Sequence, residues 1–452
     1  MVRIALMAYR ILASNRRQVL TALGAAASGL VLPRTAGANE PQHLAWQATK
    51  SNFGWPAMGA LSLRWSSRFT PVWSLKPAEP APPFKAGELD IAFQNDLPQP
   101  VALTWRGVDG ASIAEPLLGS PSLAASGRQT MQLPLRHAGT MFCDLGLLAD
   151  GAAEPSRGQP LIVSEAEPVP VDRDQIVLIE EWRVRRDGTA IGPGADSKDT
   201  EAFHTVNGNF GSDLPGDPVR ANQRWRYRFI NASHRSVVAV KLENLDVRVL
   251  AVDSRPAEPF SARNGALVLA PGARVDAFVD LTGAPGTSFA MRLHDGKQAH
   301  LIETLAISKE PPVRPTPLPP AEALPATGMP AQFDLKSALR VDVPLSGGEW
   351  TPPRSFTASS APAFRTKLGR VVVLALTNRA EIATVFHLHG HHFRLLDRLD
   401  DGWKPFWLDT LAIEPGQTQR IAFLAEYAGR YLLESTATDW AAPKLVRWYI
   451  VE

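Results

Sequence analysis

The sequence predicts an all-β protein built from three consecutive Greek-key β-sandwich domains. Apolar and polar residues alternate with a period of two along many short segments, and stretches with a helical period are almost absent. The 39 prolines and 33 glycines are spread along the whole chain, which suits short strands joined by turns. A length of 452 residues is too great for one ordinary core and favours two or three domains.

An internal repeat sets the number of domains at three. An alternating strand that ends on asparagine occurs at Glu88–Asn95, Arg224–Asn231 and Val371–Asn378, so the asparagines are 136 and 147 residues apart. Each copy is followed downstream by a Gly-bearing turn that leads into another alternating strand, at 125–133, 270–278 and 414–423. A repeat of this length with period-2 strands indicates a small sandwich that occurs three times.

The repeat also places the domain boundaries. We expect a targeting segment at 1–38, domains at 39–168, 169–310 and 331–452, and a linker at 311–330. The linker is rich in proline, and such segments are extended and semi-rigid.

The N-terminal segment has the pattern of a twin-arginine export signal. Arg16 and Arg17 precede a mild apolar stretch from Leu20 to Leu32, and Ala36-Gly37-Ala38 offers a small-x-small cleavage site. The stretch is too short to span a bilayer, so we expect no membrane span in the mature chain. A chance Arg-Arg before a buried helix is the alternative. The signal predicts a protein that folds in the cytoplasm and works in the periplasm, with either Met1 or Met7 as its start.

Charge and cysteine content exclude some classes of partner and of cross-link. The formal net charge of +2 includes five arginines in residues 1–38, so the mature chain has 42 basic and 45 acidic residues. This balance gives no reason to expect nucleic acid or anionic lipid as a partner. Cys143 is the single cysteine, so no internal disulfide is possible.

Several motifs resemble those of a known family. Thr205–Asn209, Phe229–Ser233 and Leu269–Asp276 resemble the middle domain of multicopper oxidases. Phe386–Phe393, followed by Asp409-Thr410, resembles the start of their third domain. The resemblance extends from about Gly87 to the C-terminus and implies three cupredoxin-like, or plastocyanin-like, domains.

Most of the trinuclear-copper ligands that the resemblance implies are replaced in this chain. Copper in this family is bound by histidine pairs from four strands, because imidazole nitrogens are good copper ligands. His387 and His389 lie 9 and 11 residues after Asn378, and the same steps from Asn95 reach Thr104 and Arg106. The other two pairs of positions carry Asp144 with Gly146, and Glu434 with Thr436. Two of the eight implied ligands are therefore histidine.

The implied blue-copper site is also replaced. Its two histidine positions carry Thr384 and Trp440, its thiolate position carries Ser435, and its axial position carries Leu445. Because a blue site needs a cysteine thiolate, the chain is expected to have no catalytic residues for oxidase chemistry and no copper cofactor. The remaining single histidines are expected to be surface or core residues rather than ligands: His43, His137, His204, His234, His294 and His300.

Three interpretations remain open for the pocket formed by Thr104, Arg106, Asp144, His387, His389, Glu434 and Thr436. In the first, Arg106 replaces copper as the cation and pairs with Asp144 or Glu434 across the interface of the first and third domains. In the second, His387, His389 and a carboxylate hold one copper ion. In the third, the pocket is solvated and contains neither.

For function, the chain is similar to the copper-free, twin-arginine-exported cell-division proteins of the FtsP type. This resemblance implies a non-catalytic scaffold or binding protein of the envelope or division machinery, with periplasmic proteins as partners. The alternative is a residual copper-binding protein or a multicopper oxidase-type oxidoreductase. Copper-handling relatives often carry clustered methionines, whereas this chain has seven methionines and no cluster.

Overall fold

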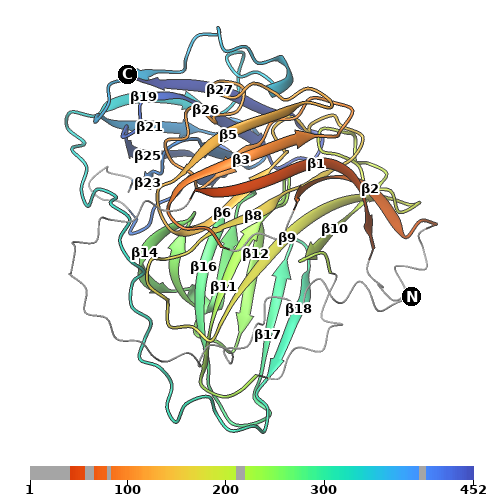
Figure 1. Cartoon of the computed structure of the whole chain (residues 1–452), viewed down its shortest axis with the longest axis vertical. Coiled ribbons are helices and arrows are strands. Elements are labelled where there is room, and N and C mark those ends of the chain that lie inside the picture. Colours follow the sequence, from red (N-terminus) through yellow and green to blue (C-terminus); the bar gives the residue numbers. More distant parts are fainter. Residues whose placement is uncertain (1–40, 56–65, 79–82, 210–218, 397–403) are drawn as a thin grey trace, which may run out of the picture. The chain divides into compact units, whose positions relative to one another are not determined.

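A computed structural model describes residues 41–55, 66–78, 83–209, 219–396 and 404–452 of the chain. Strands dominate these residues (Figure 1), and the helical elements among them are two short 3-10 turns, η2 (Arg263–Gly265) and η3 (Pro353–Ser355). The expected all-β fold is therefore confirmed. Among the helices of the described ranges, none is long and apolar enough to cross a bilayer.

The first group of strands forms one core. Its strands are β1 (Gln42–Gly54), β2 (Phe69–Pro77), β3 (Gly87–Asn95), β4 (Thr104–Arg106), β5 (Arg128–Leu135), β6 (Gly139–Asp144), β7 (Ser156–Arg157) and β8 (Gln159–Val163). They make two sheets, ordered β5-β3-β1-β2-β7 and β4-β6-β8. Alternate residues of β3, such as Ile91 and Phe93, are buried in a common core with Met141 of β6 and Leu161 of β8.

The second group has the same organisation. Its strands are β9 (Arg173–Arg185), β10 (Thr200–Val206), β11 (Gln223–Asn231), β12 (Val238–Glu243), β13 (Arg248–Val252), β14 (Arg255–Ser261), β15 (Ala266–Leu269), β16 (Arg274–Leu281), β17 (Ser288–His294) and β18 (Ala299–Ala306). They make two sheets, ordered β10-β9-β11-β16-β13-β14 and β15-β12-β17-β18. Tyr227, Val240 and Leu293 are buried in a second core between strands of both sheets.

The third group completes the described chain. Its strands are β19 (Leu339–Pro344), β20 (Arg365–Thr366), β21 (Val371–Thr377), β22 (Thr384–Leu388), β23 (Arg394–Leu395), β24 (Thr410–Ile413), β25 (Thr418–Leu424), β26 (Gly429–Ala437) and β27 (Lys444–Val451). They make two sheets, ordered β19-β21-β25-β23 and β20-β27-β26-β22-β24. Leu374, Phe386 and Tyr449 are buried in a third core.

Strand pairing shows that the three groups share one topology. In each group the first strand runs parallel to the repeat strand, as in β1 with β3, β9 with β11, and β19 with β21. The repeat strand is then antiparallel to the strand after the Gly-bearing turn, as in β3 with β5, β11 with β16, and β21 with β25. The internal repeat in the sequence therefore corresponds to a repeated sandwich.

The repeated asparagine has the same structural role each time. Asn95, Asn231 and Asn378 are buried, and the side-chain oxygen of each accepts a hydrogen bond from the backbone N–H two residues later, at 3.0, 3.0 and 2.9 Å. Each side-chain amide also donates to carbonyls of two separate chain segments. Asparagine is suited to this position because its side chain is both donor and acceptor and imitates a backbone turn.

The proline-rich stretch at 311–330 contains no strand and lies against the second group. Arg220 donates to the Pro311 carbonyl at 2.8 Å, and Arg224 donates to the Pro319 carbonyl at 2.6 Å. Ala321 is buried beside Leu250 and Phe278. Because these contacts recur along its length, the stretch is fastened to the middle sandwich.

The β13–β14 hairpin connects the middle group to both others. Val252 pairs with Arg255, so the turn has two residues, Asp253 and Ser254, both in the left-handed region with φ of 46° and 69°. Such a conformation is typical of a tight two-residue hairpin turn. We call Asp253 and Ser254 the hairpin tip.

The hairpin tip bonds to backbone of the first and third groups. The Ser254 hydroxyl donates to the Gly107 carbonyl at 3.2 Å, and the Asp253 carboxylate accepts the backbone N–H of Asp409 at 3.1 Å. Gly139 permits the approach, since a Cβ there would lie 2.3 Å from the Ser254 carbonyl oxygen. The tip therefore lies at a junction of all three groups.

Candidate functional site

Two equivalent cross-strand pairs form the floor of the pocket expected from the sequence. Thr104 on β4 lies directly opposite Asp144 on β6, and His387 on β22 lies directly opposite Glu434 on β26. Equal offsets from Asn95 and Asn378 predict this correspondence, because they select the same strand position in two copies of one topology. Thr104 is fully buried, and its hydroxyl has no hydrogen-bond partner within the described residues.

Arg106 links the two pairs. Its side chain is buried, and its Nη2 donates to Glu434 Oε2 at 3.2 Å. Its Nε lies 3.8 Å from Asp144 Oδ2, which is an ion-pair distance rather than a hydrogen bond. The contact between Arg106 and an acidic residue of the third domain is therefore present, as the first of the three interpretations requires.

Glu434 is the centre of the network. Besides Arg106, its carboxylate accepts from Lys444 Nζ at 2.9 Å and from His389 Nε2 at 2.8 Å. Burial alone would raise the pKa of Glu434, but Lys444, Arg106 and His389 hold that pKa well below its usual range. One buried carboxylate thus carries three cationic partners.

His389 is enclosed between two carboxylates. Its Nδ1 lies 2.8 Å from Glu115 Oε1, and its Nε2 lies 2.8 Å from Glu434 Oε1. Although burial disfavours the charged ring, Glu115 and Glu434 raise the pKa of His389 to about 9. The ring is therefore an imidazolium at neutral pH, with both nitrogens used as donors and neither available to a metal.

His387 has a different state. Its Nδ1 lies 3.0 Å from both the Asp409 carbonyl and the Thr410 hydroxyl, and its buried Nε2 has no hydrogen-bond partner in the described structure. Burial and the charge of Arg106 hold the pKa of His387 well below its usual range. The ring is neutral, and its Nε2 carries a lone pair.

A small cavity of about 40 Å³ adjoins this network. Its lining includes the side chains Arg106, Asp144, Ser233, Arg235, His387, Glu434, Thr436 and Lys444. A volume of this size holds roughly two or three water molecules, which is too little for a typical organic ligand. The residual pocket, as we call the seven residues predicted from the sequence together with Lys444 and Glu115, is thus a filled ionic network with little free space.

The positions implied for the blue site are partly brought together. Thr384 and Ser435 lie on the neighbouring strands β22 and β26, and Leu445 lies directly opposite Ser435 on β27. The Ser435 hydroxyl donates to the Leu345 carbonyl at 2.6 Å. Trp440 is buried, and its indole N–H donates to the Gly192 carbonyl at 3.0 Å. The polar groups of these two side chains are thus bonded to backbone carbonyls.

Lys444 and Glu115 are part of the network, although no repeat spacing in the sequence singles them out. Lys444 lies opposite Thr436 on β27, immediately before the predicted axial position Leu445. A lysine immediately before an implied ligand position is the one signal that the sequence offers for it. Glu115 lies in the connection between β4 and β5, where no repeat offset points to it. The export residues Arg16 and Arg17 and both possible start sites lie outside the described residues.

The protonation of His389 predicts a decline of stability in alkali. The folded pKa of about 9 exceeds the usual histidine value, so the stabilisation is complete below about pH 6.5 and is lost as pH rises through about 9. The unfolding free energy should fall by up to about 3 kcal/mol over this window. Urea unfolding at several pH values would measure the decline, with His389→Gln as the comparison. Equal alkaline declines in both proteins would contradict the assignment of the charge to His389.

Comparisons with known proteins agree with this fold. Two family models, each described as multicopper oxidase, match residues 174–310 and 330–452. Among solved structures, the multi-copper oxidase from Pseudomonas thermotolerans aligns with a TM-score of 0.74 and 20% identity, covering 92% of this chain and 100% of that one.

Two further structures give the same result. Lac15 from a marine microbial metagenome aligns with a TM-score of 0.70 and 23% identity, covering 91% of this chain and 100% of that one. McoA multicopper oxidase from Aquifex aeolicus aligns with a TM-score of 0.70 and 14% identity, covering 91% and 96%. At these identities the structures show a shared fold. No curated protein sequence gives a significant match.

Proposed function

Because the chain belongs to the multicopper oxidase family, we propose that it is a non-catalytic member of it, a periplasmic scaffold or binding protein of the envelope or division machinery. The observation that carries this proposal is the ionic network of the residual pocket. It places fixed cationic side chains at strand positions where the family resemblance implies copper ligands.

The donor set does not fit a trinuclear copper cluster. Such a cluster needs many unprotonated imidazole nitrogens, and the pocket offers the lone pair of His387 Nε2. His389 has both nitrogens within 2.8 Å of carboxylate oxygens. Arg106 and Lys444, both paired with Glu434, would repel metal cations. The same charges argue against a single copper ion at His387 and His389.

The residues at the blue-site positions do not fit copper either. Ser435 stands at the thiolate position, and its hydroxyl is bonded to the Leu345 carbonyl. Cys143 lies on β6 in the first group, and burial, with the charge of Asp144, raises the pKa of its thiol well above the usual range. Cys143 lies on a different strand and in a different sandwich from Ser435, so it cannot supply the thiolate that the Ser435 position lacks.

The network gives the pocket a structural role. Arg106 belongs to the first sandwich and Glu434 to the third, so their ion pair joins the surfaces that a metal cluster would otherwise join. The interface is thereby kept without redox chemistry. A protein that keeps three packed sandwiches and has lost most of the copper ligands implied by its family is suited to binding other proteins through its surface. Export by the twin-arginine route, through Arg16 and Arg17, would bring it folded to periplasmic partners.

Oxidase activity and colour test the proposal. Mature protein from the periplasmic fraction, incubated with copper, is expected to show no intense blue absorption and no turnover of phenolic or diamine substrates, because Ser435 cannot supply a thiolate. The double variant Arg16→Lys, Arg17→Lys, expected to remain in the cytoplasm, is the control for the cellular fraction. Blue absorption or copper-dependent turnover that persists in a Cys143→Ser variant would refute the proposal. A colourless bound ion would leave it standing.

A further inference from the structure

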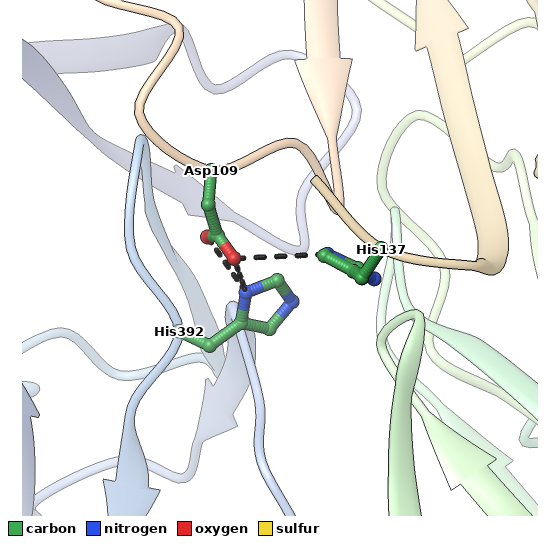
Figure 2. Close-up of side chains that lie close together, drawn as sticks. All are labelled: Asp109, His137 and His392. Atoms are coloured by element: carbon green, nitrogen blue, oxygen red, sulfur yellow. Dashed lines mark hydrogen bonds and ion pairs between the residues drawn. The ribbon is translucent and has the colours of Figure 1, made fainter. Parts of the chain in front are cut away.

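A second histidine-carboxylate cluster lies outside the residual pocket. Asp109, His137 and His392 are all buried, with metal-binding atoms within 4.8 Å of one another (Figure 2). Asp109 and His137 belong to connections of the first group, and His392 follows β22 in the third. His392 Nδ1 lies 2.8 Å from Asp109 Oδ1, and His137 Nε2 lies 3.7 Å from Asp109 Oδ2.

Backbone carbonyls fix which ring nitrogens carry hydrogen. His137 Nδ1 lies 2.8 Å from the Ala138 carbonyl, and His392 Nε2 lies 2.6 Å from the Asp253 carbonyl. A carbonyl accepts and cannot donate, so each of these nitrogens must carry the hydrogen. His137 Nε2 therefore presents a lone pair toward Asp109, whereas His392 Nδ1 lies at hydrogen-bond distance from that carboxylate.

The lone pair of His137 Nε2 lies 3.7 Å from the Asp109 carboxylate, and a cation between the two would remove their repulsion. His137 Nε2 is buried and has no hydrogen-bond partner within the described chain. Metal-binding histidines commonly donate their second N–H to a backbone carbonyl, as both rings do here.

We propose that Asp109, His137 and His392 form a site for one divalent transition-metal ion of the kind that prefers imidazole and carboxylate, zinc or copper. Two imidazole nitrogens and one carboxylate oxygen are a donor set that these ions accept, whereas Mg²⁺ and Ca²⁺ prefer oxygen alone. The ion would fasten a loop of the first sandwich to the third, beside the hairpin tip.

Arg255 is the competitor for this site. Its guanidinium contacts the Asp109 carboxylate, and its Nε lies 3.5 Å from His392 Nδ1. The same side chain donates to the Thr327 carbonyl at 3.2 Å, and it interacts electrostatically with the carboxylate of Glu426. Arg255 therefore has acceptors to retain when an ion takes its place at Asp109, and its charge weakens metal binding until it moves.

Titration of the purified mature protein with Zn²⁺ and Cu²⁺ tests the site, with Mg²⁺ as the oxygen-preferring comparison. One ion should bind and raise the thermal midpoint. His137→Gln and His392→Gln should each weaken binding by roughly 100-fold, and Arg255→Gln should strengthen it by roughly 10-fold because a competing cation is removed. His300→Gln, which changes a histidine paired with Asp295 at the surface, should bind like the unchanged protein.

The following results would overturn the proposed metal site. Absence of Zn²⁺ and Cu²⁺ binding in both the unchanged protein and Arg255→Gln would overturn the site. Binding lost in His387→Gln and kept in His137→Gln would also overturn it, because the ion would then lie in the residual pocket. If the His137→Gln variant fails to fold, the test is the affinity of Arg255→Gln for Zn²⁺ and Cu²⁺ compared with that of the unchanged protein. Equal affinities of these two proteins would overturn the site.

Discussion

Replacing Glu434 by glutamine is expected to lower the free energy of unfolding by about 3–5 kcal/mol, because it leaves buried cations without their shared carboxylate. Arg106, Lys444 and His389 all bond to Glu434 at 2.8–3.2 Å. Glutamine keeps the size and one acceptor but removes the charge. Asp144 and Glu115 remain as the nearest anions, each already engaged with one of these cations.

Urea unfolding of the single and double variants measures this effect. Lys444→Met alone should lower the free energy of unfolding less than Glu434→Gln, since Glu434 still contacts Arg106 and His389. Adding Lys444→Met to Glu434→Gln should recover part of the loss, because one stranded cation is removed. Arg106→Ala should also cost less than Glu434→Gln for the same reason. A Glu434→Gln protein as stable as the unchanged one would show that the network contributes nothing to the interface.

The Arg274→Met substitution is expected to lower the free energy of unfolding by a similar amount, about 3–5 kcal/mol. Here the buried anions, rather than the buried cations, lose their partner. Arg274 on β16 is fully buried and bonds to Asp409 through two nitrogens, at 2.9 and 2.7 Å. Asp253 lies 3.5 Å from the same guanidinium. Burial and the charge of Asp409 already raise the pKa of Asp253 to about 6. Without Arg274, two buried carboxylates would face each other without the guanidinium that lies between them.

The pH dependence distinguishes this cause from lost packing. Without Arg274, the buried Asp253 carboxyl is destabilising when it is ionised and much less so when it is protonated. The loss of unfolding free energy in Arg274→Met should therefore be greater at about pH 8 than at about pH 5. Urea unfolding at both pH values gives the comparison. Arg274→Met combined with Asp409→Leu, which removes both charges, should be more stable than Arg274→Met alone. A cost that does not change with pH would point to lost packing.

The fold and the floor of the residual pocket could be predicted because repetition makes distance along the chain informative. Once Asn95 and Asn378 are recognised as equivalent, equal offsets place Thr104 opposite the same kind of partner as His387. The asparagines are reliable markers because their side chains close the same turn in each sandwich. Local chemistry and global topology therefore agree at these positions.

Glu115, Lys444 and the Asp109 cluster could not be predicted in this way. Asp109, His137 and His392 come from connections between strands, where the repeats differ in length and offsets do not transfer. The sequence predicts a surface or core residue at His137, because a single histidine carries no spacing information. It is buried, but its Nε2 has no hydrogen-bond partner in the described structure. Such clusters arise from packing between domains, which sequence patterns within one domain do not encode.

The hairpin tip makes the three sandwiches depend on one another for their stability. Asp253 and Ser254 of the middle sandwich supply hydrogen bonds to backbone of both neighbours, at Gly107 and Asp409. Removing the middle sandwich would leave those backbone groups unbonded at the junction, and removing either neighbour would expose the buried tip. Unfolding should therefore be cooperative across residues 41–452, which form one compact unit, although the chain contains three separate cores. Deletion of any one sandwich is therefore expected to destabilise the other two.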